Sequence, residues 1–232
     1  MDWRQIEVSD NNSFTLNGEL LFGKVYEEVL KFHSPGIAPV KDETGWYHIN
    51  TNGVEISKKR YQRAFGYYFN KSSVVNDSLW FHIDTKGNRF YTENYSWTGN
   101  YQESVCSVRN LNNDYFHIDI NGNELYKSKY VFVGDFKDGC ACVRLVNGFY
   151  KHINKQGDFI NNKEFLDLGV FHKNFAIAKD RKGWFHIDKL GNELYKERYT
   201  MIEPFYNGFA IVDNLKNKKQ IINEKGIVIL KM

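Results

Sequence analysis

The chain has 232 residues, of which 42% are hydrophobic, enough to bury a substantial core, and its formal net charge is only +3. So small a charge argues against a protein that is held mainly by contacts with nucleic-acid phosphates. The sequence contains no run of 18 apolar residues and no apolar signal segment, so we expect a cytoplasmic protein that does not contact a membrane.

A glycine recurs along almost the whole chain at steps of 34 or 35 residues, and this period predicts a repeat protein. We expect residues 1–12 to form an N-terminal lead-in and residues 13–232 to form a single repeat domain without a flexible linker. The repeats run over residues 18–53, 53–87, 87–122, 122–157, 157–191 and 191–226, and a C-terminal capping strand follows. The glycines of the series are Gly18, Gly53, Gly87, Gly122, Gly157, Gly191 and Gly226.

Within each repeat, short β-rich runs alternate with turn residues and no helical period is sustained, so the expected fold is all β. From Gly53 onward, each glycine of the series follows an Asp or Asn three positions earlier, which is the sequence of a tight hairpin turn. A middle strand begins with a small residue in every repeat, which suggests that a neighbouring strand or ring presses close there. These small residues are Ala38, Ser73, Cys106, Ala141, Ala176 and Ala210.

Several of these segments resemble the WG-containing β-repeats of bacterial proteins. They are Gly45-Trp46-Tyr47-His48-Ile49, residues 136–141, Gly183-Trp184-Phe185-His186-Ile187-Asp188 and residues 205–212. The resemblance covers residues 13–231 and implies a repeat architecture that occurs alone or fused to other domains, sometimes methyltransferases, without a shared catalytic motif. The repeats 53–87 and 87–122 depart from the pattern, because residues 67–71 and 101–105 lack the turn glycine.

The series has one more hairpin than it has repeats, because residues 13–20 supply a hairpin at the start and residues 221–228 supply one at the end. A closed propeller would need only one of the two. We therefore expect an open, curved or superhelical array of β-hairpins with a hairpin cap at each end, and a six-bladed β-propeller is the alternative.

One position of the repeat, directly before an isoleucine, is occupied by histidine five times. A row of imidazoles could bind metal, but each histidine shares its strand face with a Trp or Tyr two residues earlier. We therefore favour a buried, hydrogen-bonded histidine ladder without metal. Its members are His48, His82, His117, His152 and His186. His33 and His172 precede the middle strand and are expected in surface turns.

No catalytic motif, metal-binding motif or cofactor-binding motif is present in the sequence. The three cysteines, Cys106, Cys140 and Cys142, have no paired CxxC spacing, so we expect reduced thiols with a packing role. The adjacent Glu27 and Glu28 would point to opposite faces of a strand and could not share a substrate. The sequence therefore assigns no catalytic residue and no cofactor, although an enzyme with an idiosyncratic site stays open.

The two repeats without the turn glycine carry bulky aromatic residues where other repeats have small or polar residues. Exposed aromatic residues are enriched at protein interfaces, so these side chains are candidates for binding a partner. The alternative is that they fill gaps left by the missing glycines. The five candidates are Tyr67, Tyr68, Phe69, Trp97 and Tyr101.

These observations favour a non-enzymatic protein-binding module that presents an extended β-repeat surface to another protein. One alternative is a subunit that binds nucleic acid or a modified nucleotide and works with a separate enzyme, because bases can stack on aromatic residues set among cations. A second alternative is an enzyme or small-ligand protein with a site in the repeats 53–87 and 87–122. Salt-dependent retention on RNA or DNA would favour the first alternative, and a deep pocket near residues 67–101 would favour the second.

Overall fold

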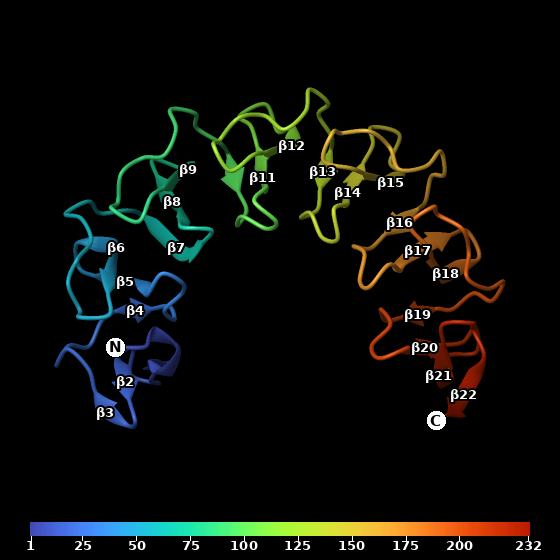
Figure 1. The fold of residues 1–232 in the computed structure, drawn as a ribbon, viewed down its shortest axis with the longest axis horizontal. Helices are drawn as coiled ribbons and strands as arrows, with labels where there is room; N and C mark the ends of the chain where they lie inside the picture. Colours follow the sequence, from blue (N-terminus) through green and yellow to red (C-terminus); the bar gives the residue numbers. More distant parts are fainter. The chain divides into compact units, whose positions relative to one another are not determined.

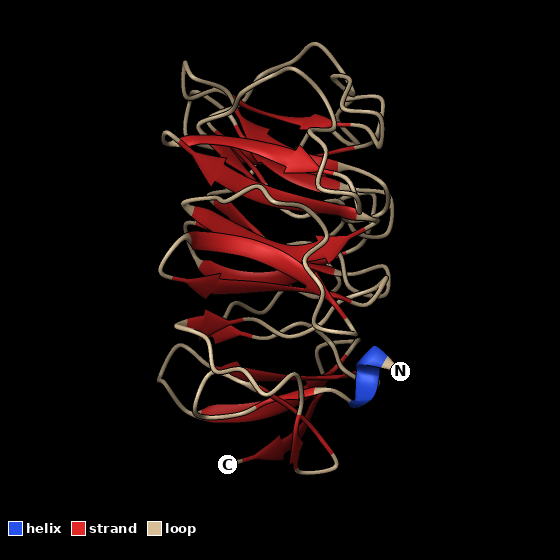
Figure 2. Ribbon diagram, turned by 90° about the vertical axis from the view of Figure 1, so that its left-hand side faces the viewer, coloured by secondary structure: helices blue, strands red, loops and turns tan.

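The computed structural model describes all residues from Met1 to Met232 and contains seven antiparallel β-sheets. The fold is all β, as the sequence predicts, apart from one short 3-10 helix (η1, Trp3–Gln5) next to the N-terminus (Figure 2). No helix of the protein is long and apolar enough to cross a membrane.

The strands are numbered in chain order in Figure 1. The first three sheets contain β1 (Glu7–Val8), β2 (Phe14–Leu16) and β3 (Glu19–Leu20); β4 (Glu28–Val29), β5 (Ile37–Asp42) and β6 (Gly45–Asn50); and β7 (Arg63–Tyr68), β8 (Lys71–Asn76) and β9 (Leu79–Ile83). The next strands are β10 (Trp97–Thr98), β11 (Cys106–Arg109) and β12 (Tyr115–Ile118). The last three sheets contain β13 (Phe132–Val133), β14 (Ala141–Arg144) and β15 (Tyr150–Ile153); β16 (Asp167–Leu168), β17 (Ala176–Asp180) and β18 (Gly183–Ile187); and β19 (Met201–Ile202), β20 (Phe209–Asp213), β21 (Lys219–Asn223) and β22 (Val228–Lys231).

The chain divides into two compact parts, Met1–Asn113 with Ile118–Asn123, and Asp114–His117 with Glu124–Met232. The first part holds the first three sheets and the pair β10–β11, and the second part holds the last three sheets. Each part has its own hydrophobic core, built around Phe14 and Ile49 in the first part and around Phe171 and Ile187 in the second. The packing of all repeats as one continuous domain, and the choice between an open array and a propeller, stay predictions.

Each repeat adds an irregular outer segment to its three strands. In the second sheet, β5 pairs with β4 and β6, and Trp46 of β6 exchanges two backbone hydrogen bonds of 2.9 Å with Tyr61. Equivalent bridges join Trp80 to Tyr95, Tyr115 to Tyr130, Tyr150 to Phe165 and Trp184 to Tyr199. The aromatic residue two positions before each ladder histidine therefore anchors the outer segment of its repeat.

The hairpin turns that end in the repeating glycines form as predicted. Asp84 is typical: its Oδ1 accepts hydrogen bonds from the backbone N–H groups of Lys86 (2.9 Å) and Asn88 (2.8 Å). The N–H of Gly87 donates to the carbonyl of Asp84, and Gly87 has φ +75°. The same double acceptance occurs at Asn50, Asp119, Asn154, Asp188 and Asn223. This confirms the turn prediction from Gly53 to Gly226.

The turn before the middle strand also forms in the two repeats that lack a glycine. Two central residues with positive φ connect the strands, as in type I′ hairpins. The central pairs are Phe69-Asn70, Glu103-Ser104, Asp138-Gly139, Lys173-Asn174 and Asn207-Gly208. Asn70 (φ +60°) and Ser104 (φ +65°) thus occupy the position of the glycine, which short polar side chains tolerate better than others do.

The prediction that the middle strand begins with a small residue is confirmed, but in one repeat this residue lies one position earlier than expected. The register of β8 against β9 places Ser72 at this position, one residue before the expected Ser73. The Oγ of Ser72 lies 3.1 Å from Nε2 of His48, and the Sγ of Cys106 lies 3.8 Å from Nε2 of His82. A ladder histidine from the preceding sheet therefore presses on this position, which explains why it is small.

Candidate protein-binding surface

All five histidines of the ladder are buried, with at most 3% of each residue exposed, as the sequence predicts. The Nε2 atom of each lies 2.8 to 3.2 Å from the backbone carbonyl oxygen of the residue 17 positions later. The accepting carbonyls belong to Phe65, Gly99, Gly134, Gly169 and Glu203. Because a carbonyl oxygen only accepts, Nε2 carries the proton and the tautomer of each imidazole is set.

A tyrosine nine residues after the histidine completes this environment in three repeats. Its hydroxyl group bonds Nδ1, which must act as the acceptor because Nε2 holds the proton. The pairs are Tyr91 with His82 and Tyr126 with His117, each at 2.5 Å, and Tyr195 with His186. In the other two repeats Ser57 and Asn161 stand in place of the tyrosine, and the buried Nδ1 atoms of His48 and His152 have no hydrogen-bond partner.

Burial lowers the pKa of each ladder histidine to about 4, although the hydrogen bond to the carbonyl opposes this shift. The imidazoles are therefore neutral at pH 7. A neutral, buried ring that bonds a carbonyl of the next sheet joins the two sheets and is not presented to solvent. No three His, Cys, Asp or Glu side chains are grouped so as to hold a metal ion.

The residue nine positions after the ladder position also packs on the glycine of the following hairpin. A Cβ atom at Gly157 would lie only 2.7 Å from the side chain of Tyr126, so no larger residue fits there. The other contacts of this kind are Phe22 on Gly53, Ser57 on Gly87, Tyr91 on Gly122, Asn161 on Gly191 and Tyr195 on Gly226. The repeating glycine is therefore needed both for the positive φ of the turn and for the close approach of this side chain.

In five sheets one cation lies over one aromatic ring, at distances of 3.5 to 4.4 Å from the ring centroid. The pairs are Arg60 with Tyr47, Arg89 with Phe81, Lys129 with Phe116, Lys151 with Phe159 and Arg198 with Phe185. A carboxylate holds the cation in three of them: Glu55 for Arg60, Glu124 for Lys129 and Glu193 for Arg198. These cations therefore already make contacts within the protein.

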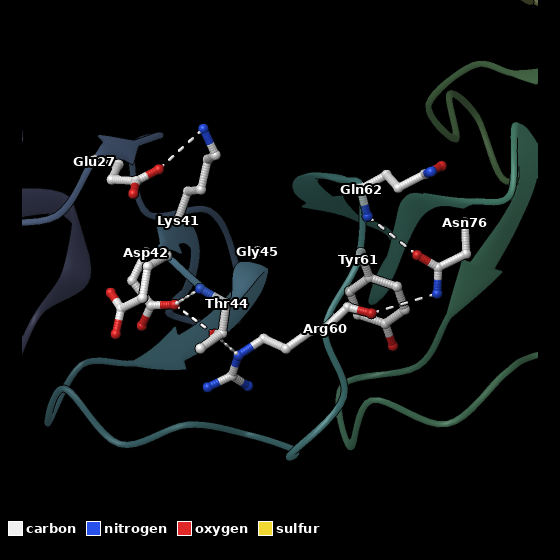
Figure 3. Close-up of a pocket in the computed structure, with 10 residues that line it drawn as sticks. Glu27, Lys41, Asp42, Thr44, Gly45, Arg60, Tyr61, Gln62 and Asn76 are labelled. Atoms are coloured by element: carbon white, nitrogen blue, oxygen red, sulfur yellow. Dashed lines mark hydrogen bonds and ion pairs between the residues drawn. The ribbon is translucent and has the colours of Figure 1, made fainter.

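A hollow of about 400 Å³ lies between the second and third sheets (Figure 3). It is lined by Glu27, Lys41, residues 42–45, residues 60–62 and Asn76. Three of its charged groups already have partners: Lys41 pairs with Glu27 at 3.1 Å, and the Nε of Arg60 donates to Thr44 at 2.7 Å. Most of the charge that the hollow presents is therefore paired.

Two titratable groups of this hollow, Asp42 and Tyr61, are poorly suited to acid–base chemistry at neutral pH. Burial alone would raise the pKa of Asp42, but two hydrogen bonds from Thr44, one from Tyr47 and the charge of Lys24 together outweigh it and lower this pKa to about 2. Burial raises the pKa of Tyr61 to about 12. Neither group changes protonation near pH 7, as an efficient general acid or base would.

Two of the five aromatic residues expected on a partner-binding surface are buried: Tyr67 is 2% exposed and Tyr101 is 1% exposed. Their hydroxyl groups donate to the carbonyls of Asp84 (2.9 Å) and Asp119 (3.3 Å). Both rings lie edge-on against ladder histidines, at the position that Phe136, Phe171 and Phe205 occupy in other repeats. The expectation that these two rings are exposed is wrong, because they belong to the regular core of the repeat.

Tyr68 and Phe69 remain on the surface, where they form a small aromatic cluster with His33. Phe69 is 50% exposed at the tip of the β7–β8 turn, and Tyr68 and His33 are half-buried. The rings of Tyr68 and His33 are 4.9 Å apart. We call His33, Tyr68 and Phe69 the turn patch. The sequence predicts His33 in a surface turn but not its contact with Tyr68. The feature that could have predicted the contact is the spacing of 35 residues, one repeat, between His33 and Tyr68.

Trp97 is the fifth candidate residue, and it lies on β10, five residues before the turn at Gln102–Val105. It pairs with Arg109 of β11 and is half-buried. The structure therefore brings Tyr68 and Phe69 together but does not add Trp97 to the same turn.

The fold is similar to that of solved structures with little sequence identity. The computationally designed Ika8 protein is 11% identical, with a TM-score of 0.52 over 98% of this chain and 83% of that chain. BamB from Moraxella catarrhalis is 12% identical, with a TM-score of 0.52 over 100% of this chain and 86% of that chain. At such identities the likeness concerns the fold alone. No curated protein sequence matches the chain.

The model of one sequence family, described as WG containing repeat, matches residues 117–148 and 184–218. Both matches begin within the strand that carries the ladder histidine and run through the turn before the middle strand. The matched segments thus contain the histidine, the hairpin glycine and the type I′ turn that recur in the structure. Two segments of the chain thus match the model of the WG containing repeat family.

Proposed function

We propose that this β-repeat module binds another protein, in the cytoplasm, through the turn patch of His33, Tyr68 and Phe69. The observation that carries the proposal is Phe69, a large aromatic residue that is 50% exposed and has φ +49°. The corresponding residues of the other type I′ turns are polar: Glu103, Asp138, Lys173 and Asn207.

Phe69 does not serve the stability of the fold. A left-handed backbone costs a residue with a Cβ about 1–2 kcal/mol, which glycine, or to a lesser degree asparagine, would avoid. Its exposed ring adds little burial in return. Strain that the surroundings hold in place, combined with an exposed apolar ring, is typical of binding sites.

The rest of the patch holds this aromatic surface in place. A Cβ at Gly66 would lie 2.5 Å from the imidazole of His33, so this glycine makes room for the histidine ring against Tyr68. Burial and the nearby Lys31 lower the pKa of His33 below its ordinary value, so the ring is neutral at pH 7. A neutral, positioned aromatic cluster of this kind suits the apolar centre of a protein interface.

A protein partner is favoured over a nucleic acid because only two cations, Lys31 and Lys71, lie within two residues of the patch in the chain, and Lys71 is already engaged. The Nζ of Lys71 lies 4.0 Å from the centroid of the Phe90 ring. A surface that stacked bases would also need cations free to meet phosphates, and the net charge of the chain is only +3.

The test is the substitution Phe69→Asn, which copies Asn207 from the seventh sheet. Partner affinity should fall by about 2 kcal/mol or more, because exposed aromatic anchors dominate interfaces. Stability should stay constant or rise by about 0.5–1 kcal/mol, because asparagine tolerates the positive φ better. The affinity would be measured by calorimetry with the partner that co-purifies from the native cell.

The matched control is Lys173→Asn, which introduces the same residue at the same turn position of the sixth sheet. It should leave binding unchanged. Equal binding by Phe69→Asn and the unchanged protein would refute the proposal. Retention of nuclease-sensitive material that is released by salt would instead identify a nucleic-acid partner.

A further inference from the structure

One face of the last sheet is apolar and partly exposed. The register places Ile211 opposite Ile221, and Ile221 opposite Leu230, so these three side chains form one row across β20, β21 and β22. Phe209 lies on the same side, two residues before Ile211. Leu230 is 51% exposed and Phe209 is 47% exposed. We call Phe209, Ile211, Ile221 and Leu230 the end face.

The equivalent face of the sixth sheet is covered by the seventh sheet. There His186 occupies the position of Ile221, is fully buried, and stacks on Phe205 with ring centroids 3.9 Å apart. Tyr195, at the position of Leu230, packs on Gly226. The structure thus shows what covers such a face: the glycine hairpin of a following sheet.

The first sheet carries a glycine hairpin that receives no such side chain. A Cβ atom at Gly18 would meet nothing within 4 Å, unlike one at the six glycines that follow it in the series of 34 or 35 residues. Beside Gly18 lies a hollow of about 430 Å³ that also contains Thr15 and Leu20. Thr15 and Leu20 face each other across β2 and β3, so they share one side of the sheet. The hollow has room for a leucine or phenylalanine side chain.

The charges next to these two surfaces are complementary. Lys219, Lys225 and Lys231 are exposed on the strands and turn of the seventh sheet. Glu7, Asp10 and Glu19 are exposed on or beside the strands of the first sheet. Opposite charges at the rim of an interface favour and orient an encounter.

We propose that the end face of one copy of this chain docks on the first sheet of a second copy, with Leu230 over the Gly18 hairpin. Each half of this contact repeats the contact that joins neighbouring sheets within the chain. The two halves come from different surfaces of the two copies, so the association is head-to-tail. The inference is independent of the turn patch and concerns a different partner.

The test uses one variant for each surface: Leu230→Asp on the end face and Leu20→Asp beside the hollow. Placing a carboxylate in an apolar contact is costly, so each variant alone should associate more weakly by about tenfold or more. Light scattering coupled to gel filtration over a range of concentrations would measure the mass. The unchanged protein should gain mass with concentration, and each variant should remain a monomer.

A mixture of the two variants makes the test specific to head-to-tail docking. The Leu20→Asp chain keeps its end face and the Leu230→Asp chain keeps its hollow, so the mixture should form dimers and nothing larger. Dimers in the mixture would also show that both variants are folded. The matched control, Leu215→Asp, changes a leucine of the same sheet that is 63% exposed in a turn, and should associate as the unchanged protein does.

Three results would overturn the proposal. One is a monomeric unchanged protein at every concentration, which would also be the result if the end face were covered within the same chain. Another is a variant that associates alone as well as the unchanged protein, which would indicate a different interface. The third is a mixture that stays monomeric although circular dichroism shows both variants folded.

Discussion

The ladder histidines show how much of the repeat depends on single hydrogen bonds. Each imidazole donates through Nε2 to a carbonyl of the next sheet, and three of them accept a tyrosine hydroxyl bond at Nδ1. His117 therefore has both ring nitrogens satisfied inside the core, whereas His152 has only one. A buried polar atom without a partner is a known cost to stability.

The first prediction at this scale concerns the tyrosine hydroxyl. Tyr126→Phe removes the donor to Nδ1 of His117 and should lower the free energy of unfolding by about 1–2 kcal/mol. Urea denaturation at pH 7 would measure it. The control is Tyr206→Phe, because Tyr206 is 59% exposed and its hydroxyl should contribute nothing measurable. Equal midpoints for the two variants would contradict this account of the histidine.

The burial of the histidines could be predicted from the sequence, because one residue type recurring once per repeat indicates a role in building the repeat. The carbonyl acceptor could not, since it lies 17 residues later on another sheet and every residue type has a carbonyl. The burial of Tyr67 was missed for a related reason. Its equivalence to Phe136 and Phe205 is nevertheless present in the period, because each of the three residues stands 14 positions after a glycine of the series.

At the scale of the element, the hairpin glycine links one repeat to the next. The side chain that packs on it is a tyrosine in three repeats, and is Ser57 or Asn161 in the two whose histidine lacks a second partner. In these two repeats a lysine two residues later donates to the carbonyl of the same glycine: Lys59 to Gly87 at 2.9 Å and Lys163 to Gly191 at 2.7 Å. The lysine thus provides a contact where the tyrosine is absent.

A second prediction places in the second repeat the two residues that stand at the equivalent positions of the third repeat. The double substitution Ser57→Tyr and Lys59→Glu copies Tyr91 and Glu93, gives Nδ1 of His48 a donor and places a ring on Gly87. We expect the free energy of unfolding to rise by about 1 kcal/mol. Lys59→Glu alone is the control and should be slightly destabilising. A double variant no more stable than this control would show that the second repeat cannot accept the tyrosine.

The turns at this scale could be predicted where an Asx residue and a glycine specify them, as at Asp84 and Gly87. The type I′ turn at Phe69 and Asn70 could not be predicted from residue type, because a phenylalanine with positive φ contradicts its own preference. The register of β8 was missed by one residue because Ser72 and Ser73 are both small. The period favours Ser72, which lies 34 residues from both Ala38 and Cys106.

At the scale of the whole molecule, burial of titratable groups makes stability depend on pH. The five ladder histidines have a pKa of about 4 in the folded protein, below the ordinary value of 6.5. Between these two values the unfolded chain binds more protons than the folded chain, so lowering the pH favours unfolding. The stability supplied by the neutral histidines is complete above pH 6.5 and is lost as the pH falls toward 4.

The third prediction follows from this sign. The urea midpoint should fall steadily from pH 7 to pH 5, since each unit of pKa difference corresponds to about 1.4 kcal/mol. Repeating the series at high salt separates the buried histidines from exposed charges, because only the latter are strongly screened. A midpoint that stays constant from pH 7 to pH 5 would mean that the histidines keep their ordinary pKa on folding.

The all-β repeat architecture could be predicted at this scale, because period and turn chemistry agree along the chain. The binding surface could be predicted only in part. On β7 the side chains alternate between the core and the surface, so Tyr67 and Tyr68 have opposite roles although they are identical neighbours in the sequence. The identity of the partner depends on surface residues that occur once, and a repeat pattern carries no information about those.

The position of the ring beneath each cation limits how one repeat can be redesigned after the others. In four repeats the ring stands at the position of Phe81, but in the fifth Lys151 takes that position, Phe159 supplies the ring from the position of Arg89, and Glu164 takes the position of Asn94. Replacing Lys151 alone by the phenylalanine of the other repeats would leave Phe159 without its cation. A cation over a ring is kept only if Phe159 and Glu164 are exchanged as well, for the glutamate and the arginine or lysine that three other repeats have at these positions.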